Sequence, residues 1–141
     1  MANINDYLEI LKSQLGLIVA PNNRIVTRSL KNYTQEQETD LLNGIFYIVS
    51  LGRAPVENKQ VFQVGILGVC KVPENTYGID VEQKEFELIA DIDQLEKDAR
   101  LSNAKLEVKN IKQSEQINHP YGYIDVTLEI TLLNTRKLGG C

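Results

Sequence analysis

The stretch Tyr121 to Leu133 alternates apolar and polar side chains without a break. Apolar residues occupy the even positions from Ile124 to Leu132, and Tyr, Asp, Thr and Glu occupy the odd positions between them. Successive side chains on a strand point to opposite faces of a sheet, so this stretch predicts a long β-strand with one apolar and one polar face. Such a strand requires partner strands elsewhere in the chain.

Two earlier stretches have the apolar composition of more fully buried strands. Leu42 to Leu51 is nearly all apolar, which predicts a strand that is central in the sheet or covered on both faces. Val61 to Val72 predicts another strand, interrupted by Gly65 and Gly68, and a glycine inside a strand often marks a bulge or a close backbone approach. The polar segment Gly52 to Gln60 between them predicts a long-looped hairpin, and such a loop is a common place for contact with another molecule.

Two weaker strand patterns complete the set. Arg24 to Leu30 includes consecutive β-branched residues and predicts the first strand. Leu106 and Val108 alternate with charged residues in a strand that precedes the turn Ser114 to Gly122. The polar, acidic segment Tyr33 to Asp40 predicts a surface loop or a short exposed helix.

Helical spacing of apolar residues predicts two helices. The first covers Ile4 to Leu15, and Gly16 suits the left-handed conformation that ends a helix. The second covers Val81 to Leu101, where Asp80 and Gln83 form a capping-box signature. Its apolar stripe consists of Leu88, Ile92, Leu95 and Ala99, widened by Val81, Phe86 and Ile89.

The predicted element order is helix, strand, strand, strand, helix, strand, strand. Two groups of strands separated by a helix predict a single α+β domain over residues 1–141, with a mixed or antiparallel sheet of about five strands and both helices on one face. One domain agrees with a length of 141 residues. Residues 134–141 show no apolar pattern, and we expect them to form a loose C-terminal tail.

A composition of 43% hydrophobic and 24% charged residues is that of an ordinary globular protein. No tract approaches the roughly 20 apolar residues that span a bilayer, and the first residues do not form a secretory signal. We therefore expect a protein that stays in the cell that makes it and does not contact a membrane. The two cysteines, Cys70 in an apolar run and Cys141 at the last position, are too few for a disulfide framework and are expected to be free thiols.

The charge is unevenly distributed along the chain. A net charge of −4 argues against a dedicated nucleic-acid binder. Residues 82–100 carry seven acids and three bases, whereas Arg24, Arg28 and Lys31 have no acid among them. Such an asymmetry is typical of solvated faces, and it also permits attraction between copies of the chain side by side.

The residues capable of catalysis do not converge in a recognisable motif. His119 is the only histidine, and its position before Pro120 predicts a place in a turn. Asp125 and Glu129 share one face of the last strand and, with Glu107, offer a carboxylate cluster for a divalent ion in a small nuclease. A solvated or subunit-contacting face explains the same alternation. The sequence therefore predicts no enzyme, no cofactor and no metal.

The order of the elements and one short motif carry a resemblance to a known family. After the first helix, Pro21-Asn22-Asn23-Arg24-Ile25-Val26 supplies a proline turn into a strand, and Leu30-Lys31-Asn32 leads toward the hairpin Leu42 to Val72. A longer helix and the strand Tyr123 to Leu133 follow. In this arrangement the chain resembles the tail-terminator or neck proteins of long-tailed bacteriophages.

This resemblance implies a structural virion protein. Its copies would form a ring, commonly a homohexamer, at the head-proximal end of the tail tube, where the ring ends tube polymerisation and joins the tail to the head. The implied partners are other copies of the chain, the tail tube protein and a head-completion or connector protein. DNA would pass through the lumen without specific binding, and the protein would be assembled in the host cytoplasm and located in the virion tail or neck.

Charged residues are the expected contacts with neighbouring subunits or with the tube. In a closed ring, the basic residues near the first strand of one copy would pair with the acids of the second helix of the next copy. The loop from Arg53 to Lys59 would point into the lumen or onto the tube. The expected contact residues are Arg24, Arg28, Lys31, Arg53, Lys59, Glu85, Asp91, Asp125 and Glu129. The alternatives are another head-tail connector, head-closure or tail-tube subunit, a small metal-dependent nuclease, and a regulatory module that binds a host protein.

Overall fold

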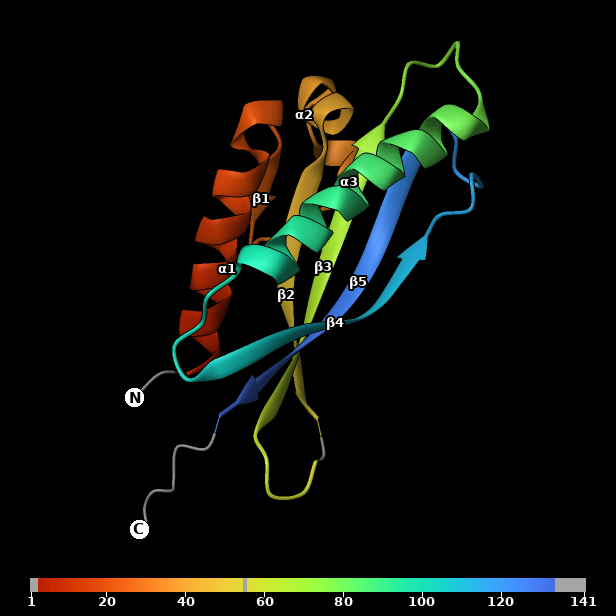
Figure 1. Cartoon of the computed structure of the whole chain (residues 1–141). Coiled ribbons are helices and arrows are strands. Elements are labelled where there is room, and N and C mark those ends of the chain that lie inside the picture. Colours follow the sequence, from red (N-terminus) through yellow and green to blue (C-terminus); the bar gives the residue numbers. More distant parts are fainter. Residues whose placement is uncertain (1–2, 55, 134–141) are drawn as a thin grey trace.

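The computed structural model describes residues 3–54 and 56–133. Within these residues, five strands form one sheet and three α-helices pack against it, as Figure 1 shows. The predicted α+β class with a five-stranded sheet is therefore confirmed. The predicted loose tail, residues 134–141, lies outside the described residues.

The sheet is mixed, with strand order β1-β2-β3-β5-β4. Its strands are β1 (Ile25–Thr27), β2 (Ile45–Ala54), β3 (Val61–Lys71), β4 (Ala104–Gln113) and β5 (Tyr121–Leu132). β1 is parallel to β2, and the other neighbouring pairs are antiparallel. The strongly alternating strand β5 lies between β3 and β4, which supplies partners on both of its edges.

Two helices, α1 (Ile4–Val19) and α3 (Gly78–Asp98), cover the same face of the sheet (Figure 1). The even positions of β5, from Ile124 to Ile130, point at these helices and have no solvent exposure. The core also contains Leu11 of α1 and Leu88 of α3, both fully buried. The predicted apolar face of β5 and the placement of two helices over it are confirmed.

The predicted end of the first helix was wrong. α1 continues through Gly16 to Val19, and a 3₁₀ turn from Ala20 to Asn22 follows it. Glycine inside a helix costs up to about 1 kcal/mol relative to alanine. Leu15 and Val19 are both fully buried, so the packing of the last turn outweighs that cost.

A third helix, α2 (Glu38–Asn43), occupies part of the acidic segment and the predicted start of the next strand. Leu41 of this helix packs against the sheet on the face opposite α1 and α3, in a small cluster with Ile45, Tyr47 and Val69. Gly44 has a φ of 113°, which places the break between α2 and β2. The strand therefore begins at Ile45 and not at Leu42.

The predicted start of the second long helix was also displaced. α3 begins at Gly78, and Asp80 accepts a hydrogen bond from the backbone N–H of Tyr77 at 2.9 Å, so Asp80 lies within the first turn and is not the capping residue. Phe86, predicted to widen the buried stripe, is 50% exposed. It follows the buried Glu85 by one residue, or about 100° around the helix, which turns it away from the sheet.

The sequence predicted a bulge or a close backbone approach at the glycines of β3, and the structure shows neither at Gly68. The atoms near Gly68 belong to side chains instead: a Cβ at this position would lie 3.0 Å from Ile124 Cγ1 and 3.0 Å from Phe46 Cε1, on the two neighbouring strands. The β2–β3 hairpin has a bulge between Ser50 and Gly52 and extends to Ala54. Its loop is shorter than predicted, because Gly52 and Arg53 belong to β2.

Candidate interaction surfaces

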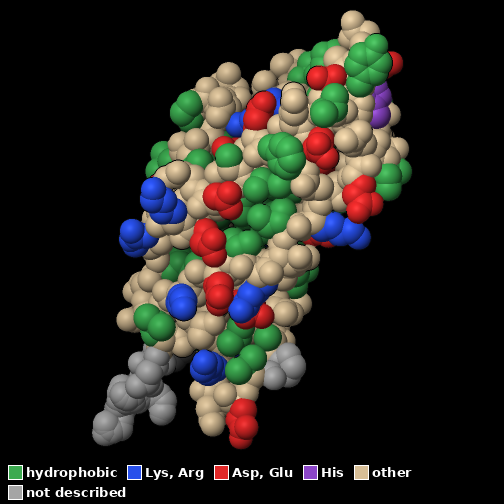
Figure 2. All heavy atoms as spheres, turned by 45° about the vertical axis from the view of Figure 1, so that its right-hand side comes forward, with side chains coloured by type: hydrophobic (Ala, Val, Ile, Leu, Met, Phe, Trp, Pro, Cys, Tyr) green, Lys and Arg blue, Asp and Glu red, His purple; other side chains and the backbone are tan. Residues whose placement is uncertain are grey.

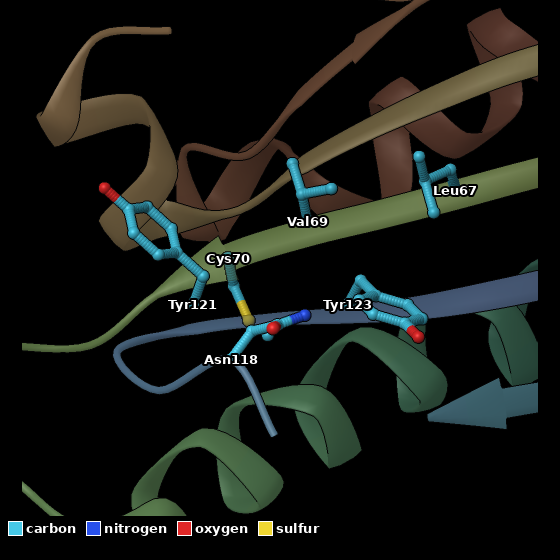
Figure 3. A pocket seen from close by; sticks show the side chains of 7 residues that line it. Leu67, Val69, Cys70, Asn118, Tyr121 and Tyr123 are labelled. Carbon is cyan, nitrogen blue, oxygen red and sulfur yellow. The ribbon is translucent and has the colours of Figure 1, made fainter. Parts of the chain in front are cut away.

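The face of the sheet opposite α1 and α3 carries an apolar hollow near the start of β5. The hollow has a volume of about 260 Å³. It is lined by Leu67, Val69, Cys70, Asn118, Tyr121, Gly122 and Tyr123. Figure 3 shows Leu67 and Val69 on β3 and the two tyrosines on β5 around it. The odd positions of β5 therefore form a face that is more apolar at its start than the sequence pattern indicates.

Glu85 lies inside the protein next to this hollow and forms hydrogen bonds that position one of its walls. Its carboxylate is 1% exposed and accepts hydrogen bonds from Gln113 Nε2 at 3.1 Å, from the Ser114 hydroxyl, and from the backbone N–H of Tyr123 at 2.9 Å. The predicted contact residue Glu85 thus joins α3 to β4 and β5. It has almost no surface to offer a neighbouring subunit.

Cys70 lies behind the hollow and is 1% exposed. Burial and, to a smaller extent, the nearby charge of Glu85 raise the pKa of its thiol to about 12. The thiol is free, as predicted, while Cys141 lies outside the described residues. Cys70 therefore acts as a small apolar side chain in the core.

Arg24 forms its ion pairs within one chain. Its side chain is 3% exposed, with Nη2 at 2.8 Å from Glu87 Oε1 and Nη1 at 3.3 Å from Asp91 Oδ2. The pKa of Asp91 is raised overall, because burial raises it by more than the charge of Arg24 lowers it. The sequence predicted that these charges attract neighbouring copies of the chain, but here they hold the segment after α1 against α3. Neither Arg24 nor Asp91 therefore exposes its charge for a contact with another subunit.

The other two basic residues of this segment also have partners in the same chain. Arg28 Nη1 lies 2.9 Å from Glu9 Oε2 and 2.6 Å from Asn5 Oδ1 on α1. Lys31 Nζ lies 3.7 Å from Glu36 Oε1. Both basic side chains keep part of their surface exposed, so they remain open to further contacts.

The polar face of β5 does not gather its carboxylates into one site. Glu129 lies opposite Glu107 on β4, and Lys109 Nζ stands 3.8 Å from Glu129 and 3.2 Å from Glu107. Asp125 is exposed and lies four residues, or about 13 Å, along the strand from Glu129. Among the described residues, no three His, Cys, Asp or Glu side chains are close enough to hold a metal ion. The cluster that the nuclease alternative needs is not assembled here.

The β2–β3 hairpin forms one end of the molecule, shown at the bottom of Figure 1. Arg53 lies over the ring of Phe62, with 5.6 Å between its guanidinium carbon and the ring centre. A second hollow, of about 430 Å³, lies beside the hairpin loop. It is lined by Asn58, Lys59, Lys105, Thr131, Leu132 and Leu133. Sequence reasoning found Lys59 but missed Lys105, because only the pairing of β4 with β5 brings Lys105 next to the hairpin.

The opposite end of the strands consists of the loop 73–77 and the turn 114–120. The two segments are joined by a 2.9 Å hydrogen bond from the backbone N–H of Val72 to the Pro120 carbonyl, and by a 3.2 Å contact between Thr76 Oγ1 and His119 Nε2. His119 therefore has the turn position that the sequence predicted. Tyr77 and Ile117 are 78% and 74% exposed there. Sequence reasoning did not identify this end as a surface of interest.

No protein-family model matches this chain, and no curated protein matches it in sequence. None of the described helices combines the length and the apolar character required to cross a lipid bilayer.

Proposed function

We propose that this chain is a structural subunit of a bacteriophage tail, a terminator whose copies form a ring at the head-proximal end of the tail tube. The ring ends polymerisation of the tube and joins the tail to the head. The partners are other copies of the chain, the tail tube protein and a head-completion or connector protein, and DNA passes through the lumen without specific binding. The location is the virion tail or neck.

The observation that carries this proposal is the sheet face opposite α1 and α3. α2 covers one end of it, and the rest offers an apolar hollow bordered by Tyr121 and Tyr123. Buried apolar pockets with aromatic borders are typical centres of protein–protein contacts. The resemblance in element order to phage neck proteins supports the same class of function. We assign the hollow to a contact with another virion subunit.

The charges around this face support a protein partner. On β4 and β5, three lysines (Lys105, Lys109 and Lys112) stand among three acids (Glu107, Asp125 and Glu129). A balanced face does not attract the phosphate backbone of DNA, which requires a surplus of positive charge. This is the property that a subunit surrounding a DNA channel needs.

Native mass spectrometry and electron microscopy of the purified full chain test the proposal. The expected result is a closed ring of fixed copy number that caps purified tail tubes and stops their growth. A stable monomer at all concentrations would overturn it, and long tubes of this chain alone would make it a tail-tube subunit. The variant Leu67→Arg, which fills the hollow with a charge, should abolish capping, whereas Ala90→Arg on the exposed side of α3 should retain it.

A further inference from the structure

The two ends of the molecule carry complementary surfaces. At one end, loop 73–77 and turn 114–118 form a surface that we call the acidic tip, made of Glu74, Tyr77, Glu115 and Ile117. At the other end, the hollow beside the hairpin, lined by Lys59 and Lys105, is called the basic hollow. The two surfaces differ in charge and in shape, because the tip protrudes and the hollow is concave.

The acidic tip combines negative charge with exposed apolar side chains. Residues 73–77 and 114–118 contain two acids, Glu74 and Glu115, and no lysine or arginine. The side chain of Glu74 is 79% exposed, and its one ion pair, to Lys71 Nζ, spans 3.8 Å. Figure 2 shows hydrophobic and acidic side chains together at the upper end of the molecule. Large exposed apolar side chains among charges are typical of interaction sites.

The basic hollow is the counterpart of the tip. Neither Lys59 nor Lys105 forms an ion pair with any other described residue, and no acid lines the hollow. Its apolar part comes from Leu132 and from Leu133, which is 50% exposed. A volume of about 430 Å³ is enough for a large apolar side chain such as Tyr77 or Ile117.

We propose that the acidic tip of one copy docks into the basic hollow of the next copy, and that this is the contact that builds the ring. The inference rests on the proposed function, because a ring requires a contact between two different surfaces of the same chain. The ends of β3, Val61 and Lys71, border the two surfaces and are about 33 Å apart. The acidic tip of one molecule therefore cannot reach the basic hollow of the same molecule, and a second copy carries the matching charge.

Charge reversal at exposed positions tests this contact. The tip variant Glu74→Lys/Glu115→Lys and the hollow variant Lys59→Glu/Lys105→Glu each place like charges against each other. Each should raise the concentration for half-assembly at least tenfold, measured by light scattering and native mass spectrometry. All four positions are exposed, and circular dichroism checks that each variant folds.

Restoration of assembly distinguishes this contact from a general effect of net charge. An equimolar mixture of the two variants should assemble, since each supplies the end that the other needs, and so should one chain with all four substitutions. Asp93→Lys/Ala90→Lys adds positive charge on the outer side of α3 and should leave assembly unchanged. Wild-type assembly should also weaken between 0.05 M and 0.5 M salt, because screening acts on exposed charges.

The outcomes separate this inference from the proposed function. If the wild type forms closed rings and the reversals leave them unchanged, the tip–hollow contact is wrong and the ring function stands. If the reversals and the mixture behave as expected but the assemblies are open chains of indefinite length, the contact is right and the terminator ring is wrong. A wild type that stays monomeric overturns both.

Discussion

Glu85 on α3 accepts a 2.9 Å hydrogen bond from the backbone N–H of Tyr123 on β5, and its carboxylate is almost completely buried. The same carboxylate accepts hydrogen bonds from Gln113 and Ser114, at the end of β4 and the start of the turn. One side chain therefore fixes α3 to the end of β4, to the turn and to β5, and the turn and β5 both border the apolar hollow. Because all of these hydrogen bonds are formed within the fold, replacing Glu85 tests its contribution to the stability of the folded protein.

Glu85→Ala should lower the free energy of unfolding by about 3 kcal/mol, because three donors lose their acceptor and a cavity remains. Urea denaturation followed by circular dichroism measures the change. Glu82→Ala, one turn earlier on α3, removes a carboxylate that accepts an exposed hydrogen bond from Gln116 Nε2 at 3.5 Å; it is the control and should change stability by less than about 0.5 kcal/mol. Equal losses in both variants would contradict the role assigned to Glu85.

Arg24→Met should destabilise the protein by about 3 kcal/mol at pH 7, because it leaves the carboxylate of Asp91 buried without its cation. The double variant Arg24→Met/Asp91→Asn should recover much of the loss. Urea denaturation of both variants and the wild type gives the comparison. No recovery in the double variant would show that the loss does not come from the unpaired carboxylate of Asp91.

The same pair predicts a pH dependence. The pKa of Asp91 is raised above 3.8 in the folded protein, so ionisation of this carboxyl costs stability. Its contribution to stability is fully present below 3.8 and is lost as the pH rises through the folded pKa. Arg24→Met raises this pKa further, so the deficit of the variant should shrink on acidification from pH 7 to pH 5. A constant deficit over this range would contradict the prediction.

Cys70 should resist thiol reagents in the folded protein. Burial raises the pKa of its thiol to about 12, and the thiolate is the reactive form. In a Cys141→Ser variant, the chromogenic disulfide reagent DTNB at pH 8 should label no thiol in buffer and one thiol in urea. Rapid labelling in buffer would show that the region around Gly122 opens readily.

Substitution by alanine should change the stability of the protein in opposite directions at two glycines. At Gly122 a Cβ would lie 2.5 Å from Val81 Cγ1 and 2.7 Å from Glu85 Oε2, so Gly122→Ala should destabilise the protein by about 2 kcal/mol. At Gly16 nothing lies within 4 Å, and Gly16→Ala should stabilise α1 by about 0.5–1 kcal/mol. Thermal unfolding of the two variants checks both signs.

The candidate surfaces were only partly predictable from the sequence. The loop with Arg53 and Lys59 was identified because it is a polar connection between two apolar strands. Lys105 was not identified, because its place beside Lys59 depends on a strand pairing between residues far apart in the chain. Tyr77 and Ile117 were missed for the same reason, since each occurs singly in a polar stretch and only the fold brings the two loops together.

Local patterns determined the fold class of this protein. The alternation from Tyr121 to Leu133 fixed β5 and its buried face, and helical spacing fixed the existence of α1 and α3, because each pattern reports which side of one element avoids water.

Only the tertiary structure decided the rest. Burial of Leu15 and Val19 stabilises α1 beyond Gly16, and burial of Leu41 stabilises α2 against the sheet. In both helices the burying side chains come from residues distant in the sequence. Arg24 and Glu85 look like surface charges in the sequence, yet partners 63 and 38 residues away bury them. The sequence determines which side chains avoid water within each element, whereas the pairing of elements determines which charges remain free to meet another molecule.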